Sequence, residues 1–251
     1  MTITSTANER IRFFKTLKTK KGRDETGTFL LEGRRAVRDA LANGLTPLCV
    51  ILEENEPAPD AACEVLRVSR RVLEALSDTS SPEGIMAQVA MPCTDFLTQT
   101  LQGTVVFLDR LQDPGNIGTI IRTADAAGAA AVIVSPECAE LFSPKTVRAS
   151  MSAVFSLPVM KAESSVSALR RLKANGFSLF AADMGGQALP RQTELPKKSC
   201  LMIGNEGNGL SPEVKAEADL TISLPMRGKS ESLNAAVAAG ILLYYFSFPV
   251  L

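Results

Sequence analysis

LMIGNEGNGLSPEV, residues 201–214, and LTISLPMRGKSESLNAAVAAGILLYY, residues 220–245, decide how this chain folds. Each stretch begins with a short apolar run that predicts a strand and continues into a polar loop that contains glycine. A loop that follows a strand presents main-chain groups to a small ligand. The second loop leads into an alanine-rich apolar helix, for which Ser232 or Asn234 is the candidate N-cap. The two loops therefore predict a small-molecule site.

An earlier segment has the same organisation. Residues 104–109 (TVVFLD) are apolar and β-branched, which is typical of a buried parallel strand. A polar loop follows, then a predicted helix over 117–127 that ends at Gly128, and another strand over 130–135. Functional loops in such βαβ units lie beyond the carboxyl ends of the strands. On this helix we expect Asn116 at the cap and Arg122 about two turns further along.

These segments carry three motifs. They resemble those of the SpoU (TrmH-like) family of RNA ribose 2′-O-methyltransferases, in the SPOUT superfamily. The matching residues are Asp113-Pro114-x-Asn116-x-Gly118 with Arg122-Thr123-Ala124, then Gly204-Asn205-Glu206-Gly207-x-Gly209-Leu210, then Leu224-Pro225-Met226-x-Gly228 with Glu231-Ser232-Leu233-Asn234. A segment at 143–155 is also similar, with Ser152 where the family usually has glycine. Because the motifs occur in order and at the family's spacing, a set of unrelated tight turns is a poor explanation.

The resemblance implies an α/β fold, in which a C-terminal SPOUT-type parallel sheet is tied into a trefoil knot. It also implies a homodimer with its sites near the dimer interface. Predicted strands and helices alternate in the N-terminal part, which indicates a small α/β domain of its own. This part resembles the ribosomal-protein-like substrate-binding domain of many SpoU enzymes. We predict a substrate-binding domain at 1–92, a linker at 93–103 and a catalytic domain at 104–251.

The activity that the resemblance implies is methyl transfer from S-adenosylmethionine to a ribose 2′-hydroxyl of RNA. Adenosine requires backbone hydrogen-bonding groups and an apolar slot, which the two C-terminal loops can supply. The residues expected to bind this cofactor are Ile203, Gly204, Gly209, Leu224, Met226, Leu233 and Asn234.

The family resemblance makes Arg122 the proton acceptor for the hydroxyl. A guanidinium is effectively never deprotonated in proteins, so stabilisation of the developing alkoxide is the physically better role. Glu206, Ser232 and Asn116 are the other candidates to accept or relay the proton. Asn234 is expected to orient the methyl donor or the hydroxyl.

Basic residues are concentrated near the N-terminus. Within residues 9–39 they outnumber acidic residues two to one, and a solvated helix face is the alternative explanation. In an RNA-directed enzyme they become candidates for phosphate contacts. The candidates are Arg10, Lys15, Lys18, Lys20 and Lys21, with Lys145 and Arg148 further along the chain. By analogy with the ribosomal-protein-like domain, rRNA is the expected substrate, with tRNA as the alternative.

Composition excludes several other functions. The chain has no histidine, which removes Ser-His-Asp and Cys-His chemistry. Its five cysteines are scattered without a CxxC pair, so neither a disulfide framework nor a zinc site is expected, and no metal is needed. The N-terminus lacks the apolar core of a signal peptide, and the apolar C-terminal run is broken by Gly240 and Pro249. We therefore expect a cytoplasmic protein without a membrane partner.

Two alternatives from other classes remain open. One is a non-catalytic RNA-binding relative with the same fold. The presence of all five candidate catalytic residues argues against it. The other is an enzyme that acts on a small nucleotide, which would not need the basic N-terminal segment.

Overall fold

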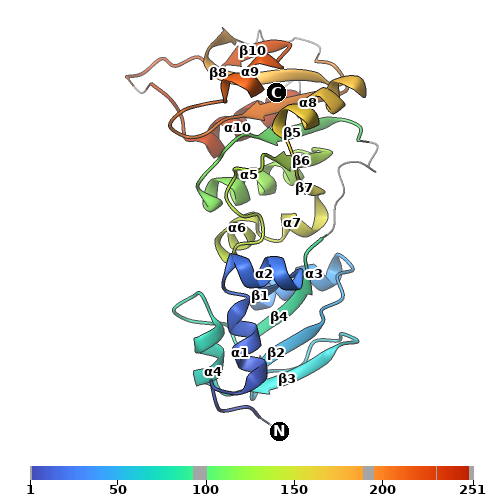
Figure 1. The fold of residues 1–251 in the computed structure, drawn as a ribbon, viewed down its shortest axis with the longest axis vertical. Coiled ribbons are helices and arrows are strands. Elements are labelled where there is room, and N and C mark those ends of the chain that lie inside the picture. The colour runs from blue at the N-terminus through green and yellow to red at the C-terminus, as the bar shows by residue number, and fades with distance from the viewer. Residues whose placement is uncertain (1, 93–100, 189–194, 230, 249–251) are drawn as a thin grey trace. The chain divides into compact units, whose positions relative to one another are not determined.

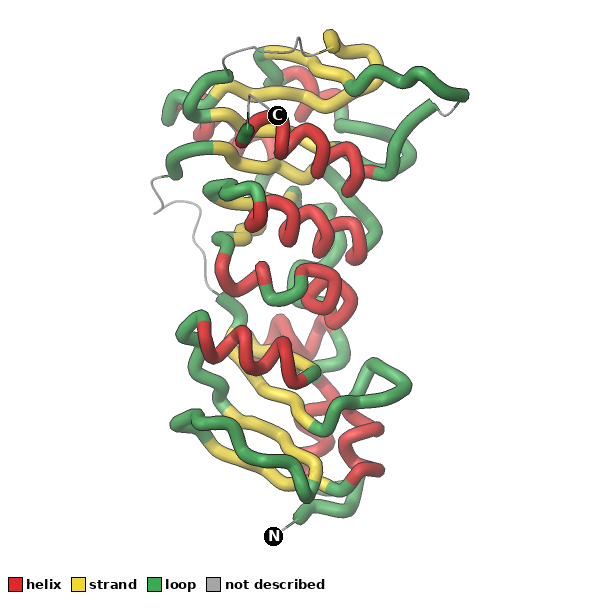
Figure 2. Tube along the Cα trace, turned by 180° about the vertical axis from the view of Figure 1, so that it is seen from behind, coloured by secondary structure: helices red, strands yellow, loops and turns green. Residues whose placement is uncertain are grey.

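The computed structural model describes residues 2–92, 101–188, 195–229 and 231–248, whose helices and strands are drawn in Figures 1 and 2. The chain forms two compact units. The first is Met1–Cys93 with Phe142–Phe155, and the second is Thr94–Leu141 with Ser156–Leu251. The segment Phe142–Phe155 belongs by sequence to the expected catalytic domain. Of the expected linker at 93–103, residues 93–100 lie outside the described part of the chain.

The first unit is built on a four-stranded sheet in the order β1-β4-β2-β3, in which β4 runs antiparallel to both neighbours and β2 and β3 are parallel. The strands are β1 (Thr28–Glu32), β2 (Cys49–Glu53), β3 (Glu64–Val68) and β4 (Ile85–Ala90). The helices are α1 (Glu9–Thr16), α2 (Lys20–Thr26), α3 (Arg34–Ala42), α4 (Arg70–Leu76) and α6 (Pro144–Ser150). This confirms the predicted N-terminal α/β unit.

Both faces of this sheet are covered. Successive residues of a strand point to opposite faces. On β2, Ile51 packs with Phe14 of α1, whereas Val50 and Leu52 pack with Val37 of α3. Each of these side chains is at most 1% exposed. The unit therefore has two hydrophobic clusters, one on each side of the sheet.

The second unit contains a six-stranded sheet in the order β10-β8-β9-β5-β6-β7, and all of its strand pairs are parallel. The strands are β5 (Thr104–Leu108), β6 (Ala131–Val134), β7 (Val159–Lys161), β8 (Ser178–Ala188), β9 (Ser199–Ile203) and β10 (Leu220–Ser223). The helices are α5 (Pro114–Ala126), α8 (Ser165–Ala174), α9 (Pro212–Ala216) and α10 (Ala235–Ser247), and α7 (Ala153–Ser156) joins the two units in sequence. The predicted parallel sheet is confirmed, and the trefoil knot stays a prediction.

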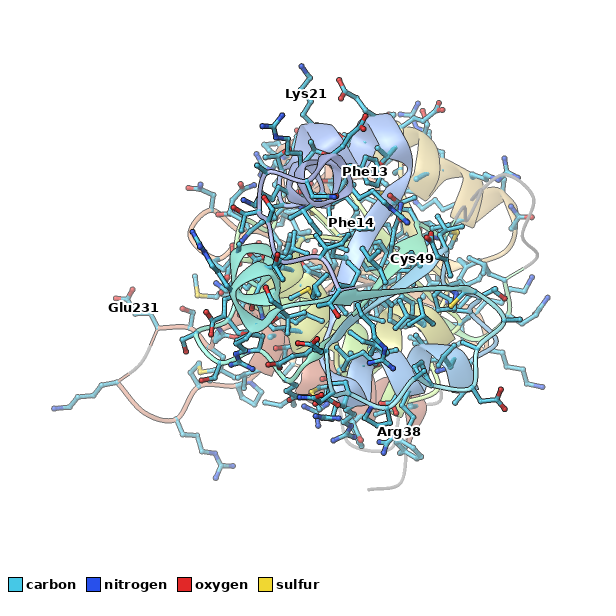
Figure 3. All side chains as sticks on the ribbon, turned by 90° about the horizontal axis from the view of Figure 1, so that it is seen from below. Phe13, Phe14, Lys21, Arg38, Cys49 and Glu231 are labelled. Carbon is cyan, nitrogen blue, oxygen red and sulfur yellow. The ribbon has the colours of Figure 1, made fainter. Side chains whose placement is uncertain are left out.

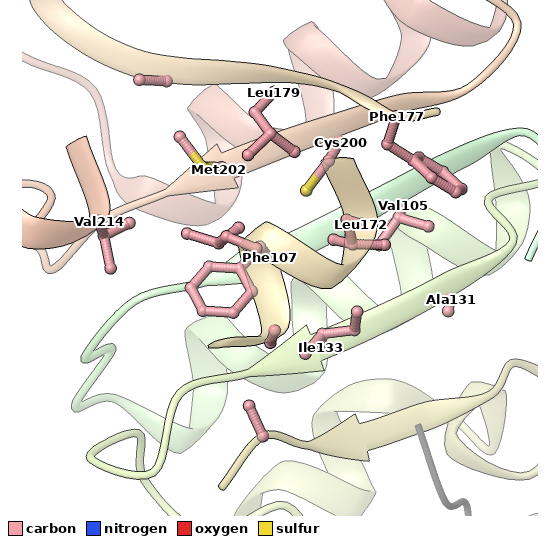
Figure 4. Packing of buried hydrophobic residues seen from close by; sticks show 14 of the residues in the cluster. Val105, Phe107, Ala131, Ile133, Leu172, Phe177, Leu179, Cys200, Met202 and Val214 are labelled. Atoms are coloured by element: carbon pink, nitrogen blue, oxygen red, sulfur yellow. The ribbon is translucent and has the colours of Figure 1, made fainter. Parts of the chain in front are cut away.

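The core on one face of this sheet packs against α8 and α9 (Figure 4). Phe107 of β5, Met202 of β9 and Leu172 of α8 are among its buried members. Cys200, also on β9, is fully buried there, and burial raises the pKa of its thiol. Such a thiol is an inert packing group. Within the described part of the chain, Cys49, Cys63, Cys138 and Cys200 are free cysteines.

The strand order explains why the motifs meet. Strand β9 lies between β5 and β8, and β8 lies between β9 and β10. Because these strands are parallel, their carboxyl ends share one edge of the sheet. The loops that carry the three motifs follow β5, β9 and β10, so they leave the sheet at that edge.

Candidate active site at the carboxyl edge of the parallel sheet

A cavity of about 670 Å³ lies at this edge, within the second unit. Its walls come from β8, from the loops after β9 and β10, and from α10. Six of the residues expected to bind the cofactor line it, namely Ile203, Gly204, Gly209, Leu224, Met226 and Leu233. The candidate catalytic residues Glu206 and Ser232 line it as well. The structure thus brings together residues that lie far apart in the sequence.

The loop after β9 is a closed turn that requires glycine. The backbone N–H groups of Asn205 and Gly209 each donate to the other's carbonyl oxygen, at 3.0 and 2.9 Å. A Cβ atom on Gly204 would lie 2.2 Å from the carbonyl carbon of Gly209, so no larger residue fits. Gly209 has φ +65°, a conformation that favours glycine. Gly204 and Gly209 are therefore explained by the turn, whose residues form one wall of the cavity.

The loop after β5 is tied to the loop after β9. Asp109 is buried, and its Oδ2 accepts a hydrogen bond from the backbone N–H of Ser211 at 2.7 Å. The side-chain amide of Asn205 donates to the carbonyl oxygen of Arg110 at 2.9 Å. Arg110 has φ 57°, which is uncommon for a residue other than glycine. These contacts hold the first and second motifs in a fixed relation.

Helix α5 begins earlier than the sequence predicted. Asp113 is its N-cap, and the Oδ1 atom of Asp113 accepts from the N–H of Gly115 at 3.0 Å. Asn116 lies inside the first turn, so the expectation that Asn116 is the cap was wrong. Proline at the first helical position has a suitable fixed φ and no N–H to satisfy, and Pro114 directly follows a good capping residue. The side chain of Asn116 is therefore available for another contact.

That contact is part of a hydrogen-bonded chain that joins all three motifs. The Nδ2 atom of Asn116 donates to Oε1 of Glu206 at 2.9 Å. The Nδ2 atom of Asn234 donates to Oδ1 of Asn116 at 3.0 Å. The Oδ1 atom of Asn234 accepts from the N–H groups of Ala236 and Val237, at 2.9 and 3.3 Å, and so caps α10. Of the two candidate caps, the structure selects Asn234.

Both ends of this chain determine its polarity. A carboxylate only accepts hydrogen bonds, and the free N–H groups of a helix only donate them. Asn116 must therefore turn its amide nitrogen toward Glu206, and Asn234 must turn its oxygen toward α10. The amide orientation of one asparagine therefore fixes that of the other, so Asn116 and Asn234 are positioned together.

Glu206 is held in its charged form. Burial alone would raise the pKa of Glu206, but hydrogen bonds from the Asn116 side chain and from the backbone N–H groups of Gln112 and Asp113 bring its pKa below the ordinary value. A carboxylate with a lowered pKa is a weak base toward a ribose hydroxyl. The geometry therefore favours a positioning role for Glu206 over proton acceptance.

Arg122 lies outside the cavity. It is exposed on α5 and is not among the described residues that line the cavity of its own chain. It follows Asn116 by six residues, which places it about 9 Å further along the helix axis. A single chain therefore does not bring Arg122 to the residues that surround the expected cofactor.

The lining residues that were not predicted include Asp183 and Met184 of β8. The pairing of β8 with β10 shifts register, so that Thr221 pairs with Ala181 and the next residue, Ile222, pairs with Gln187. The irregular stretch of β8 between these pairs contributes Asp183 and Met184 to the cavity. Neither the strand order nor the register shift has a signal in the local sequence.

The basic residues expected to contact RNA fall into two groups. Arg10 forms a two-pronged ion pair with Glu64, and Lys18 donates to the carbonyl oxygen of Ser77 at 2.7 Å. Both contacts stabilise the first unit, and they leave the charges of Arg10 and Lys18 less available for contacts with RNA phosphates. Lys15 is half-buried, and Lys20, Lys21, Lys145 and Arg148 are exposed. In Figure 3, Lys21 and Arg38 lie at opposite edges of the view.

The cavity fits an adenosine-containing cofactor. Its volume is typical of small-molecule sites, which combine apolar walls with a few polar groups. Leu224, Met226 and Leu233 supply apolar surface, and the loop from Gly204 to Gly209 supplies backbone groups beside the Glu206 side chain. Over the described ranges, no group of three potential metal ligands is found, and no helix is long and apolar enough to cross a membrane.

Comparisons with known proteins agree with this site. Residues 103–244 match the SpoU rRNA Methylase family, and residues 8–87 match the MRM3-like substrate binding domain. The chain is 34% identical to the 23S rRNA (guanosine(2553)-2'-O)-methyltransferase RlmP of Bacillus subtilis, over 97% of this chain and 98% of that protein. It is 32% identical to the 23S rRNA (uridine(2479)-2'-O)-methyltransferase of Streptomyces viridochromogenes, over 88% and 83% of the two chains.

A solved structure shows the same fold with the cofactor. The AdoMet-bound rRNA methyltransferase from Sinorhizobium meliloti superimposes with a TM-score of 0.89 at 32% identity, covering 100% of this chain and 98% of that one. The resemblance that the three motifs indicated is thereby confirmed, together with S-adenosylmethionine as the cofactor. This chain belongs to the SpoU family of RNA methyltransferases.

Proposed function

We propose that this enzyme transfers the methyl group of S-adenosylmethionine to a ribose 2′-hydroxyl of ribosomal RNA. The observation that carries the proposal is the cavity that the second and third motifs line, to which the hydrogen-bonded chain Asn234–Asn116–Glu206 joins the first motif. The preference for rRNA over tRNA is supported by the two relatives named above and by the match to a substrate-binding domain.

In this proposal the cavity binds the methyl donor, whose sulfonium supplies an electrophilic methyl group. Ile203, Gly204 and Gly209 offer backbone to it, and Leu224, Met226 and Leu233 offer apolar surface. In the hydrogen-bonded chain, Asn116 and Asn234 each donate only one of their two amide N–H bonds, so each has a second N–H that this chain does not use. These N–H groups are suited to hold the donor or the ribose hydroxyl in a reactive orientation, with Ser232 nearby in the lining.

Arg122 stabilises the developing alkoxide in the same proposal, which requires a second copy of the chain. Helix α10 supports this requirement because it is apolar on every side. Val237, Ile241 and Tyr244 recur at helical spacing and are 51%, 47% and 40% exposed. A helix of this kind is normally covered all round. We therefore propose a homodimer in which a partner covers this face of α10.

Arg122 is well placed for such an arrangement. Helices α5 and α10 pack closely, since a Cβ atom on Gly240 would lie 3.5 Å from the Cγ2 atom of Thr123. Arg122 is the neighbour of Thr123 and is exposed beside this contact. A partner docked on α10 would meet Arg122, so that the guanidinium of one chain could serve the cavity of the other.

RNA binding is assigned to the remaining surface cations. We propose that Lys15, Lys20 and Lys21 of the substrate-binding domain at 1–92 contact phosphates, with Lys145 and Arg148 of the catalytic domain at 104–251. Arg10 and Lys18 keep their structural contacts and add less. An rRNA substrate places the enzyme in the cytoplasm with the ribosomes.

The test is to map ribose methylation across rRNA and tRNA in cells with and without the gene. The expected result is the loss of one 2′-O-methyl mark from rRNA and its restoration by the purified enzyme with S-adenosylmethionine. Loss of a tRNA mark instead would assign the enzyme to tRNA. An unchanged methylation map, with no transfer to RNA in vitro, would overturn the proposal and leave the two alternatives, a non-catalytic RNA-binding protein or an enzyme that acts on a small nucleotide.

A further inference from the structure

The ionisable side chains that line the cavity all carry the same sign of charge. Among the described lining residues they are Asp183, Glu206 and Glu231, and this lining includes no lysine or arginine. Acidic residues alone do not define a ligand. Their meaning depends on whether other groups in the protein neutralise them, and in this respect the three differ.

Asp183 is neutralised from outside the cavity. Its Oδ2 atom accepts from Nζ of Lys215 at 2.8 Å, and its Oδ1 atom accepts from the N–H of Gly185 at 3.0 Å. The Lys215 bond, and after it the Gly185 bond, lower the pKa of Asp183. Glu231 is exposed, and Figure 3 shows its side chain pointing away from the body of the protein. Water therefore screens the charge of Glu231.

Glu206 is exposed as well, but unlike Glu231 it is held in place by several hydrogen bonds, and unlike Asp183 it has no ion pair among the described residues. Among the described residues, its hydrogen bonds come from the side-chain amides of Asn116 and Asn205 and from the backbone N–H groups of Gln112 and Asp113. All of these donors are neutral. They keep the carboxylate ionised and fixed in place without cancelling its charge, so Glu206 brings one uncompensated negative charge to the cavity.

The two ligands that must occupy the cavity in turn differ by one charge. The methyl donor carries a sulfonium, an ammonium and a carboxylate, and its net charge is positive. The demethylated product, S-adenosylhomocysteine, has a neutral thioether in place of the sulfonium and is neutral overall. Both have the same adenosine and amino-acid parts, so apolar surface and backbone hydrogen bonds hold them almost equally. Charge is the property by which the protein can distinguish them.

We propose that Glu206 makes the cavity selective for the positively charged methyl donor over its neutral product. This inference rests on the proposed assignment of the cavity as the donor site. At a partly exposed site, one uncompensated charge gives a preference on the order of tenfold. Methyl transfer removes the charge that Glu206 attracts, so product release follows from the reaction itself. Glu206 is in this sense a specificity-determining residue.

The first test uses the unmodified protein and isothermal titration calorimetry. The ligands are S-adenosylmethionine, S-adenosylhomocysteine and sinefungin, which has a protonated amine in place of the sulfonium methyl group. We expect the donor and sinefungin to bind more tightly than the product at low salt, and we expect this preference to shrink at high salt. A product that binds as tightly as the donor at low salt, or a preference that salt does not change, would overturn the inference.

The second test compares two substitutions. Glu206→Gln retains an oxygen that can accept from Asn116 but removes the charge, and it should reduce the preference for the donor by about tenfold. Glu213→Gln removes a charge from the first turn of α9, outside the cavity lining, and should leave the preference unchanged. An equal effect of both substitutions, or none of either, would contradict the role of Glu206. If Glu206→Gln does not fold, the salt and sinefungin series on the unmodified protein decides.

The same measurements separate this inference from the proposed function. Leu233→Arg should abolish binding of all three ligands, because Leu233 lines the cavity. If the ligands do not bind at all, or bind despite Leu233→Arg, the cavity is not the donor site and both proposals fail. If Leu233→Arg blocks binding but Glu206→Gln leaves the preference unchanged, only the charge selectivity fails.

Discussion

Replacement of Asn234 by aspartate separates the two tasks of this residue. Asn234 caps α10 with its oxygen and donates to Asn116 with its nitrogen. In Asn234→Asp, one carboxylate oxygen still serves the cap, and the new charge at the helix N-terminus adds about 0.5 kcal/mol of stability. The other carboxylate oxygen then faces Oδ1 of Asn116, where two acceptors meet. If Asn116 turns to relieve this contact, its oxygen faces the carboxylate of Glu206 instead.

The magnitudes follow from these contacts. Loss of the Asn116 hydrogen bond costs about 1 kcal/mol, so the gain at the cap leaves Asn234→Asp less than about 1 kcal/mol below the unmodified protein. Asn234→Ala loses the cap and the hydrogen bond, about 2 kcal/mol together. The conflict between acceptors is worth about 1–3 kcal/mol, which predicts a fall in kcat/KM of about 5- to 150-fold for Asn234→Asp. Aspartate should thus harm activity far more than stability.

Urea denaturation measures the change in stability. The change in kcat/KM is measured by transfer of a labelled methyl group to rRNA from cells that lack the gene. The matched control is Ser164→Ala, which removes the cap of α8, where the Oγ atom accepts from the N–H of Ser167. It should cost about 1 kcal/mol of stability and leave kcat/KM unchanged. If Asn234→Asp keeps near-normal kcat/KM, the chain of amides does not position the reacting groups, and the reasoning is refuted.

Three further substitutions test other parts of the site. Arg122→Ala should reduce turnover by more than about 100-fold while calorimetry shows nearly unchanged donor affinity, and near-normal turnover would contradict its electrostatic role. Leu233→Arg should raise the donor Kd by more than about 100-fold, since it places a long cation in the cavity, and normal affinity would mean that the donor binds elsewhere. Ile241→Glu should yield a monomer in analytical ultracentrifugation and lower turnover, whereas an unmodified protein that is itself monomeric would exclude the proposed dimer face.

The site could be predicted from the sequence where its residues lie in loops that follow strands. Gly204, Leu224 and Leu233 were placed correctly in one cavity because parallel strands put their carboxyl ends at the same edge. The start of α5 was misjudged although the signal was present, since Asp113-Pro114 is a stronger start than an asparagine two residues later.

Other features depend on contacts between distant residues. Arg10 pairs with Glu64 and Lys18 with Ser77, and no local pattern shows that these cations are occupied within the protein. Asp183 reaches the cavity only because β8 changes register against β10. For α10, the composition predicts an apolar helix but cannot say which side faces the core, the cavity or solvent, because periodicity is lost when nearly every position is apolar.

The bond between the carboxyl group of Asp109 and the N–H of Ser211 bears on which wall of the site can open. Both residues are 1% exposed, and the bond spans 2.7 Å between the residue after β5 and the N-cap of α9. To open this side of the site, water would have to reach a buried acid, so the Ser211 amide should be among the slowest to exchange its hydrogen for deuterium. The entry and exit of ligands must then depend on movement of the opposite wall, which Leu224, Met226 and Leu233 line.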